Sequence, residues 1–135
     1  MKVRIAAAKP GEADDFLFSA WLSSWSGSGR IRLLGSAGTP ARRLITRILQ
    51  QQPRTVVWQA TDEDSRRILA VAVVSGDVLH YVYVREADRQ SGLCRAMLAD
   101  LPRPMACWWL SRGAKYVRRA LGGALTFDPL RLMDF

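Results

Sequence analysis

Apolar side chains recur at every third or fourth position in several segments of the chain, which is the spacing of an amphipathic helix. In the first segment, Phe16, Leu17 and Trp21 fall on one helical face. The segments are bounded by capping residues or by helix breakers, such as Pro53 after the second one. The pattern predicts helices over Glu12–Ser24, Ala41–Gln52, Gly92–Leu101 and Arg112–Leu121, the last of them capped by Ser111.

Shorter runs rich in β-branched and other apolar residues predict strands. The links at residues 61–65 and 75–77 are short and polar, so the three runs between Thr55 and Val84 are expected to pair as an antiparallel meander. A later run is almost continuously apolar, which is typical of a strand buried on both faces. The predicted strands are Val3–Ala8, Thr55–Ala60, Ile68–Val74, Val78–Val84, Met105–Leu110 and Ala124–Phe127.

Length and composition indicate one soluble domain spanning residues 1–135, with 49% hydrophobic and 24% charged residues and no internal repeat. No apolar run approaches the roughly 20 residues that span a bilayer, and the first residues lack the apolar core of a secretory signal. We therefore expect a cytoplasmic protein. Cys94 and Cys107 are expected to be reduced, and no spacing of Cys and His predicts a metal site. The stretch Trp25–Gly38, rich in Ser, Gly and Arg, is expected to be a mobile loop.

The chain carries a formal net charge of +8, from 20 basic and 12 acidic residues. Most of the basic residues are arginines, and only Lys2, Lys9 and Lys115 are lysines. A guanidinium group matches phosphate oxygens bidentately, so this composition favours anionic partners. Nucleic acid, a phosphorylated cofactor and an acidic protein surface all remain open at this point.

The link between the third meander strand and the third helix carries the most specific chemical signal. Arg89, Gly92 and Cys94 lie five, eight and ten residues after Val84. A helix N-terminus leaves backbone N–H groups unpaired, and a glycine lets a phosphate approach them without a Cβ in the way. This spacing, together with the order of the predicted elements, resembles the acyl-CoA pyrophosphate loop of the GNAT acetyltransferases.

The resemblance implies an α/β (α+β) fold, a single GNAT-like domain whose mixed, mostly antiparallel central sheet is flanked by about four helices. It also implies acetyl-CoA as co-substrate, with the pantetheine arm pairing along the strand edge Val82–Val84 where that strand splays from Met105–Leu110. Gln90 and Cys94 depart from the small residues usual at these positions. The residues implied in cofactor binding are Val82, Tyr83, Val84, Arg89, Gln90, Ser91, Gly92, Leu93, Cys94, Arg95 and Ser111.

In the same family a tyrosine on the fourth helix often protonates the leaving thiolate, and the matching position in this chain holds Arg118. Tyr116 is a candidate acid, although it lies two residues earlier and about 200° around the helix. His80 is the only histidine and the candidate base. The alternation of a strand is expected to place His80 on the same face as Val78, Val82 and Val84.

Three functions are consistent with these features. The first is transfer of an acetyl group from acetyl-CoA to an unidentified amine on a small molecule or a protein. The second is a catalytically inactive GNAT-fold binding or structural protein, which Arg118 suggests; the short chain also resembles small phage-encoded GNAT-like proteins. The third is a nucleic-acid-binding module that uses Arg112, Lys115 and Arg119, although the sequence identifies no aromatic platform beside them. No membrane partner is expected, and no oligomeric state is indicated.

Overall fold

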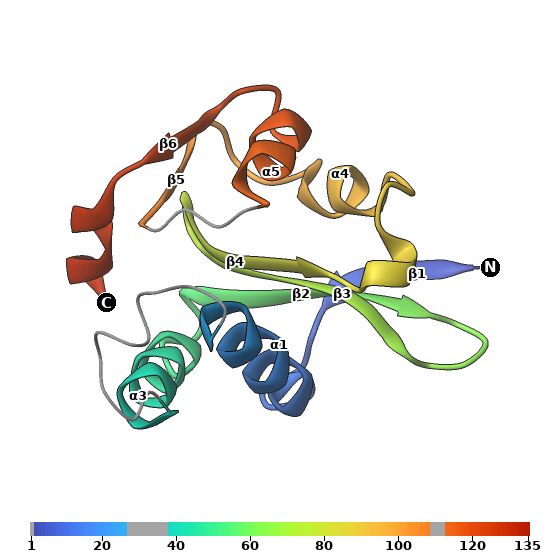
Figure 1. Ribbon diagram of the computed structural model, residues 1–135, viewed down its shortest axis with the longest axis horizontal. Coiled ribbons are helices and arrows are strands. Elements are labelled where there is room, and N and C mark those ends of the chain that lie inside the picture. Colours follow the sequence, from blue (N-terminus) through green and yellow to red (C-terminus); the bar gives the residue numbers. More distant parts are fainter. Residues whose placement is uncertain (1, 27–37, 109–112) are drawn as a thin grey trace.

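The computed structural model describes residues 2–26, 38–108 and 113–135. These residues form a six-stranded sheet of order β1-β2-β3-β4-β5-β6 (Figure 1). The first four strands pair antiparallel, and β2, β3 and β4 form the predicted meander. β4, β5 and β6 are parallel neighbours joined by helices. The predicted mixed, mostly antiparallel sheet is confirmed. The strands are β1 (Val3–Ala7), β2 (Thr55–Asp62), β3 (Ile68–Ser75), β4 (Val78–Val84), β5 (Met105–Cys107) and β6 (Leu125–Phe127).

Helices cover both faces of this sheet. Figure 1 shows α1 and α3 on one face and α4 and α5 on the other. Within the described ranges, no helix is long and apolar enough to span a bilayer, and no three His, Cys, Asp or Glu side chains are grouped to hold a metal ion. The helices are α1 (Asp14–Ser26), α3 (Gly38–Leu49), α4 (Leu93–Leu98) and α5 (Ala114–Ala120), with single 3-10 turns η1 (Glu86–Asp88) and η2 (Pro129–Asp134).

The central strand β3 separates two hydrophobic cores. Its valines Val71 and Val73 face α1 and α3, whereas Ala70 and Ala72 face α4 and α5. The alternation of side chains along a strand produces this division. On the first side the largest buried side chains include Leu17, Trp21, Ile45 and Ile48, and on the second side Met97, Leu98, Met105 and Leu121.

The helix predicted over Gly92–Leu101 is shorter in the structure. It begins only after Gly92, because that residue has a left-handed backbone with φ of 83°, and it ends at Leu98. The chain after the last predicted strand forms the turn η2. Several predictions lie outside the described residues: the cap Ser111, Arg112 at the predicted start of the fourth helix, Trp109 and Leu110 at the end of the predicted strand, and most of the predicted loop Trp25–Gly38.

A β-bulge in β4 changes the face on which His80 lies. Val73 pairs with Tyr81 but Val74 pairs with Leu79, so His80 is an extra residue in the ladder. Residues before and after the bulge no longer alternate in one register. Val82 therefore packs toward α4 and α5, whereas the His80 ring contacts Phe135 on the α1 and α3 side. The expectation that His80 shares a face with Val78, Val82 and Val84 is therefore wrong for Val82 and Val84. Val78 and the His80 ring both lie on the α1 and α3 side.

One guanidinium group links the ends of α4 and α5. Arg103 Nε donates to the Leu121 carbonyl oxygen at 3.1 Å, and its terminal nitrogens donate to the Ala99 and Ala120 carbonyls at 3.4 and 3.5 Å. These carbonyls lie at the C-terminal ends of the two helices, where the helix itself supplies no partner. The Leu121 carbonyl also accepts from the Ala124 N–H at 3.2 Å. A positive charge also interacts favourably with the negative end of each helix dipole.

We predict that Arg103→Ala lowers the free energy of unfolding by about 1 to 2 kcal/mol, the range for a lost charged hydrogen-bond donor. Arg103→Lys keeps the charge but not the planar fork, so most of the loss should remain. Urea denaturation followed by circular dichroism measures both. Arg66→Ala, at an exposed turn between β2 and β3, is the control and should change stability by no more than about 0.5 kcal/mol. Equal stabilities for the Arg103 and Arg66 variants would contradict the prediction.

Candidate functional site

The parallel strands β4 and β5 separate soon after they begin. In the part of the chain that the structure describes, their backbones pair only at Val78 and Ala106. The Ala106 N–H also donates to the Asp77 carbonyl at 2.8 Å. β4 continues six residues beyond this pair, to Val84, while β5 diverges from it (Figure 1). We call the resulting gap the β4–β5 opening.

The backbone groups of Val82 and Val84 point into this opening. Arg85 N–H donates to the Leu69 carbonyl on β3 at 2.8 Å, and the direction of backbone groups alternates along an antiparallel ladder. The backbone N–H and C=O of Tyr83 therefore also point toward β3, whereas those of Val82 and Val84 point away from β3. The Arg89 side chain agrees with this direction, because its Nε donates to the Val84 carbonyl at 2.9 Å.

The loop after β4 carries two left-handed residues. Gln90 has φ of 62° and Gly92 has φ of 83°, and Ser91 between them lies outside this region. Left-handed residues of this kind occur in loops whose successive backbone N–H groups turn toward one side and bind anions. The start of the loop is held by the ion pair between Arg85 and Asp88 at 2.7 Å. Ser91 Oγ donates to the Asp88 carbonyl, which fixes the loop just before Gly92.

On the face of β4 that packs against α1, aromatic rings form a column. The Trp21 and Tyr81 rings stack with centroids 4.9 Å apart, and the Tyr81 and Tyr83 rings are nearly parallel at 6.5 Å. Arg89 extends the column, since its guanidinium carbon lies 5.7 Å from the Tyr83 ring centroid. Tyr83 also lines a shallow groove with α1 residues Asp15, Phe16, Ser19, Ala20, Ser23 and Ser24.

The hydroxyl of Tyr81 forms a hydrogen bond with Ser24 Oγ at 2.8 Å, and burial raises the pKa of Tyr81 well above its usual value. This phenol therefore stays neutral. The sequence analysis did not single out the groove, although two signals were present. Tyr81 and Tyr83 alternate with valine along the strand, and Phe16, Ala20 and Ser24 recur at helical spacing.

No protein-family model and no curated protein matches this sequence, but solved structures resemble the fold. A possible acetyltransferase from Clostridium difficile 630 has a TM-score of 0.59 at 11% identity, covering 95% of this chain and 92% of that one. AAC(6')-Iy in complex with the bisubstrate analog CoA-S-monomethyl-acetylneamine has a TM-score of 0.52 at 14% identity, with the same coverage. Apo-form YjaB from Escherichia coli has a TM-score of 0.52 at 20% identity, covering 76% and 69%.

The chain has the GNAT acetyltransferase fold. Within this GNAT fold, the structure brings most of the predicted cofactor residues to one end of the β4–β5 opening. Tyr83 differs from the others because its ring lies on the α1 side of the sheet. Ser111 lies outside the described residues. Around the opening lie Val82 and Val84 on the strand edge, Arg89, Gln90, Ser91 and Gly92 in the loop, and Leu93, Cys94 and Arg95 in α4.

Cys94 and Leu93 contribute to packing at this end of the opening. Both side chains are partly buried against the core beneath α4 and α5. Burial raises the pKa of the Cys94 thiol, so it is neutral at pH 7. Arg95 is exposed on α4. Charge at the loop therefore comes from arginines and from backbone N–H groups rather than from the cysteine.

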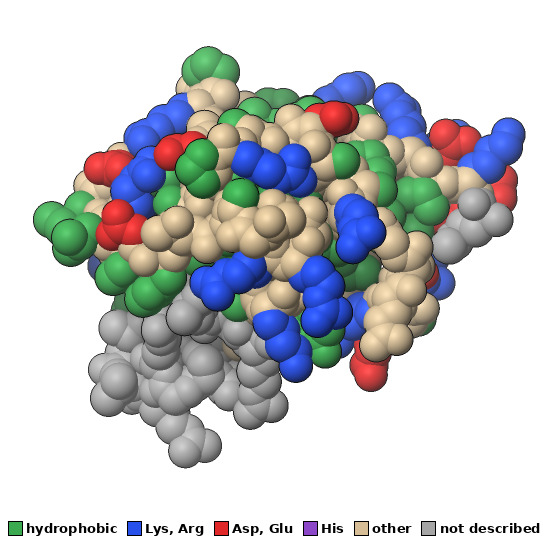
Figure 2. Space-filling model, turned by 90° about the horizontal axis from the view of Figure 1, so that it is seen from above, with side chains coloured by type: hydrophobic (Ala, Val, Ile, Leu, Met, Phe, Trp, Pro, Cys, Tyr) green, Lys and Arg blue, Asp and Glu red, His purple; other side chains and the backbone are tan. Residues whose placement is uncertain are grey.

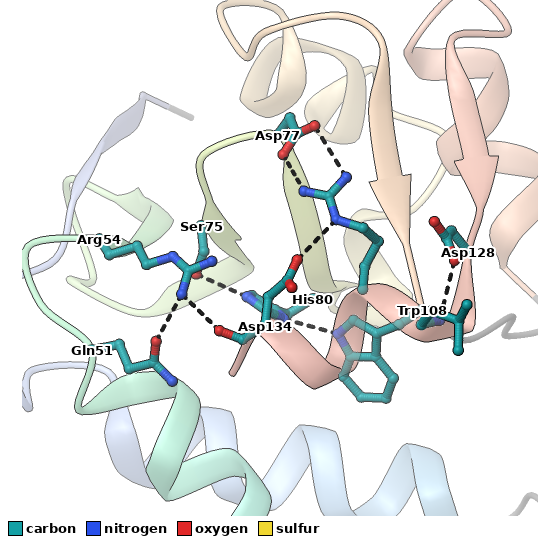
Figure 3. Close-up of polar contacts among 10 residues, drawn as sticks. Gln51, Arg54, Ser75, Asp77, His80, Trp108, Asp128 and Asp134 are labelled. Atoms are coloured by element: carbon teal, nitrogen blue, oxygen red, sulfur yellow. Dashed lines mark hydrogen bonds and ion pairs between the residues drawn. The ribbon is translucent and has the colours of Figure 1, made fainter.

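His80 belongs to a buried chain of hydrogen bonds (Figure 3) and is 1% exposed. Trp108 Nε1 donates to His80 Nδ1 at 2.9 Å. An indole nitrogen can only donate, so Nδ1 is the bare nitrogen and the proton sits on Nε2. Nε2 donates to Ser75 Oγ at 2.8 Å, and Ser75 Oγ bonds Thr55 Oγ1 at 2.7 Å.

The hydrogen bond between Trp108 and His80, here called the His80–Trp108 clamp, lies at the vertex of the opening. His80 is two residues after Val78, and Trp108 is two after Ala106, so the clamp stands where the next backbone pair would form. Burial, with a smaller effect of the Arg54 charge, lowers the pKa of His80 from 6.5 to about 4. Both ring nitrogens are engaged, which favours a structural role; the role of base stays a prediction.

The C-terminal turn η2 braces the closed end of the opening (Figure 3). Arg131 donates to both carboxylate oxygens of Asp77 at 3.2 and 2.6 Å, and these bonds lower the pKa of the Asp77 carboxyl. The Phe135 ring contacts the His80 ring edge-on, with centroids 4.5 Å apart. Arg54 lies over the other side of Phe135, 4.1 Å from the ring centroid. These contacts shield the clamp from water.

Tyr116, the candidate acid, and Arg118, at the position of the family tyrosine, have different surroundings on α5. Tyr116 is 52% exposed and its ring lies beneath the Lys115 ammonium, 5.0 Å from Nζ. Arg118 is also exposed, but its charge reaches β5. Burial raises the pKa of the Cys107 thiol, and the Arg118 charge acts in the opposite direction. Burial is the larger of the two effects, so the Cys107 thiol stays neutral, and the Arg118 charge favours its thiolate form only in part.

The clamp predicts a pH dependence of stability. Because the pKa of His80 is lower in the folded chain than in the unfolded chain, its contribution is complete above about pH 6.5 and is lost as the pH falls toward 4. A shift of this size corresponds to roughly 3 kcal/mol. The difference in free energy of unfolding between wild type and His80→Gln, which does not titrate, should shrink by about this amount from pH 7 to pH 4.

Urea denaturation at several pH values measures this difference, and the comparison of the two proteins removes the contribution of the carboxylates. An NMR titration of the His80 ring should give a midpoint of about 4. A midpoint near the ordinary value of a solvated histidine would contradict the buried, neutral clamp.

Proposed function

We propose that the chain binds acyl-CoA in the β4–β5 opening and transfers its acetyl group to an amine. The observation that carries the proposal is the edge of Val82 and Val84, which pairs with no strand of the described residues on the β5 side, beside a loop with two left-handed residues. An extended, amide-containing arm can add to such an edge as a further strand. The pantetheine arm of CoA contains two amides and fits this requirement.

The loop suits the pyrophosphate at the other end of the arm. α4 has only six residues, so its dipole contributes less than that of a long helix. The backbone N–H groups around Gln90 and Gly92 and the charges of Arg89 and Arg95 supply the attraction instead. Arg89 now donates to the Val84 carbonyl. On binding, we propose that its guanidinium exchanges this carbonyl for a phosphate oxygen and frees the strand edge.

The amine would approach from the groove between α1 and Tyr83, on the other face of β4. Its nitrogen forms a bond to the thioester carbon, the carbon–sulfur bond breaks, and CoA leaves as a thiolate. The proton that the amine loses passes to water, since His80 already accepts a hydrogen bond at Nδ1. Asp15 in the groove can attract the cationic amine before it loses this proton.

Arg118 would stabilise the leaving thiolate by charge rather than protonate it. Its guanidinium already acts on the Cys107 sulfur, and a CoA thiolate in the neighbouring opening would experience the same field. An arginine does not lose its proton in the physiological range, so this role differs from that of a tyrosine acid.

Isothermal titration with acetyl-CoA tests the binding step. We predict that Gly92→Ala weakens binding about tenfold or more, because alanine disfavours the left-handed backbone that turns the loop N–H groups outward. Gly11→Ala is the matched control, since Gly11 has φ of 82° in the link between β1 and α1. It should carry a similar strain and leave the dissociation constant unchanged. Absence of binding by the wild type would overturn the proposed function.

A second test concerns Arg118. We predict that Arg118→Gln binds acetyl-CoA within about threefold of wild type but releases CoA about tenfold more slowly in a panel of amines, because the thiolate loses its counter-charge. Arg118→Lys keeps a charge and should retain most of the rate. Arg118→Tyr should show a rate that falls above about pH 10, where a tyrosine loses its proton.

Thiol release from acetyl-CoA measures all four proteins. Equal rates for wild type and Arg118→Gln would exclude the proposed role of the charge. Binding of acetyl-CoA without thiol release for any amine would instead favour a catalytically inactive GNAT-fold binding protein.

A further inference from the structure

The outer surface of α4 and α5 carries a concentration of positive charge. Figure 2 looks onto this face and shows Lys and Arg side chains gathered over the two helices, with Asp and Glu toward the margins of the view. In the described ranges, the ion pairs of arginines involve Arg85 and Arg131, which lie elsewhere. We call the exposed set Arg95, Lys115, Arg118 and Arg119 the arginine face.

An exposed aromatic ring lies within this face. Tyr116 is 52% exposed, and the Lys115 ammonium lies 5.0 Å from its ring centroid. Val117 and Ala120 are the α5 side chains that pack toward the sheet, so the Tyr116 ring is not needed to hold the helix in place. The structure thus supplies the aromatic platform that the sequence analysis did not identify.

We propose that the arginine face binds single-stranded nucleic acid. Guanidinium and ammonium groups would contact successive phosphates, and the Tyr116 ring would stack on a base. An acidic protein partner fits less well, because protein interfaces have an apolar centre. The strongly exposed aliphatic side chains of the described residues, Leu130 and Met133, lie on η2 rather than on this face.

This surface shares Arg95 and Arg118 with the proposed acyl-CoA site, but its binding of nucleic acid does not depend on that site. Lys115 and Arg119 have no part in the β4–β5 opening. Variants of these two residues therefore test the arginine face alone.

Fluorescence anisotropy with a labelled oligothymidylate of about 12 nucleotides tests the proposal on the full chain. Binding should weaken linearly with the logarithm of salt between about 50 and 200 mM, with a slope of about −3 for four phosphate contacts on a single strand. Lys115→Glu with Arg119→Glu should lower affinity about tenfold or more and roughly halve the slope. Arg66→Glu with Arg67→Glu changes the net charge equally at a distant turn and should have a much smaller effect.

The Tyr116 ring has its own test. Tyr116→Ala should weaken oligonucleotide binding about fivefold or more. Tyr116→Phe, which keeps the ring, should bind the oligonucleotide about as tightly as wild type. Circular dichroism and urea denaturation show whether each variant stays folded. If the double Glu variant unfolds, Lys115→Gln with Arg119→Gln replaces it, with a smaller loss of affinity expected.

Three results would overturn the proposal. One is no binding by the wild type at the lowest salt. Another is equal weakening by the Arg66 and Arg67 variant, which would indicate attraction to net charge alone. The third is tighter binding of polyglutamate than of oligothymidylate, which would indicate an acidic protein partner.

Discussion

The hydrogen bond from Trp108 to His80 determines where β4 and β5 part. Among the residues that the structure describes, backbone pairing between these strands ends at Val78 and Ala106, and two residues later a side-chain bond takes its place. The bond is buried and charge-free, so water does not compete for it. The β-bulge makes this possible, because it turns His80 away from the side on which Val82 packs.

Beyond the His80–Trp108 clamp, residues 81–84 of β4 have a different environment on each side. On one side, the backbone of Val82 and Val84 faces the opening and the loop that follows. On the other side, the rings of Tyr81 and Tyr83 line the region under α1. Arg89 touches both, through the Val84 carbonyl and the Tyr83 ring. The proposed acyl-CoA and the amine that would receive its acetyl group could therefore reach β4 from different sides.

The basic residues that give the net charge of +8 fall into two groups with different surroundings. Arg103, Arg54 and Arg131 donate hydrogen bonds to helix ends, to the C-terminal segment and to Asp77, and these arginines hold the fold together. The arginines and the lysine on α4 and α5 have no acidic partner in the described part of the chain. Composition alone could not separate the two groups, because they differ only in their tertiary neighbours.

The order of elements, the meander and the spacing of the loop around Gly92 could be predicted from the chain, because they depend on local periodicity, short turns and backbone freedom. The bulge at His80, the aromatic column of Trp21 and Tyr81, and the brace at Arg131 became visible only in the folded molecule. Each joins residues far apart in the chain, and a single sequence contains no signal for which distant side chains will meet. The candidate site is therefore half local in origin, in its loop, and half tertiary, in the opening that the clamp defines.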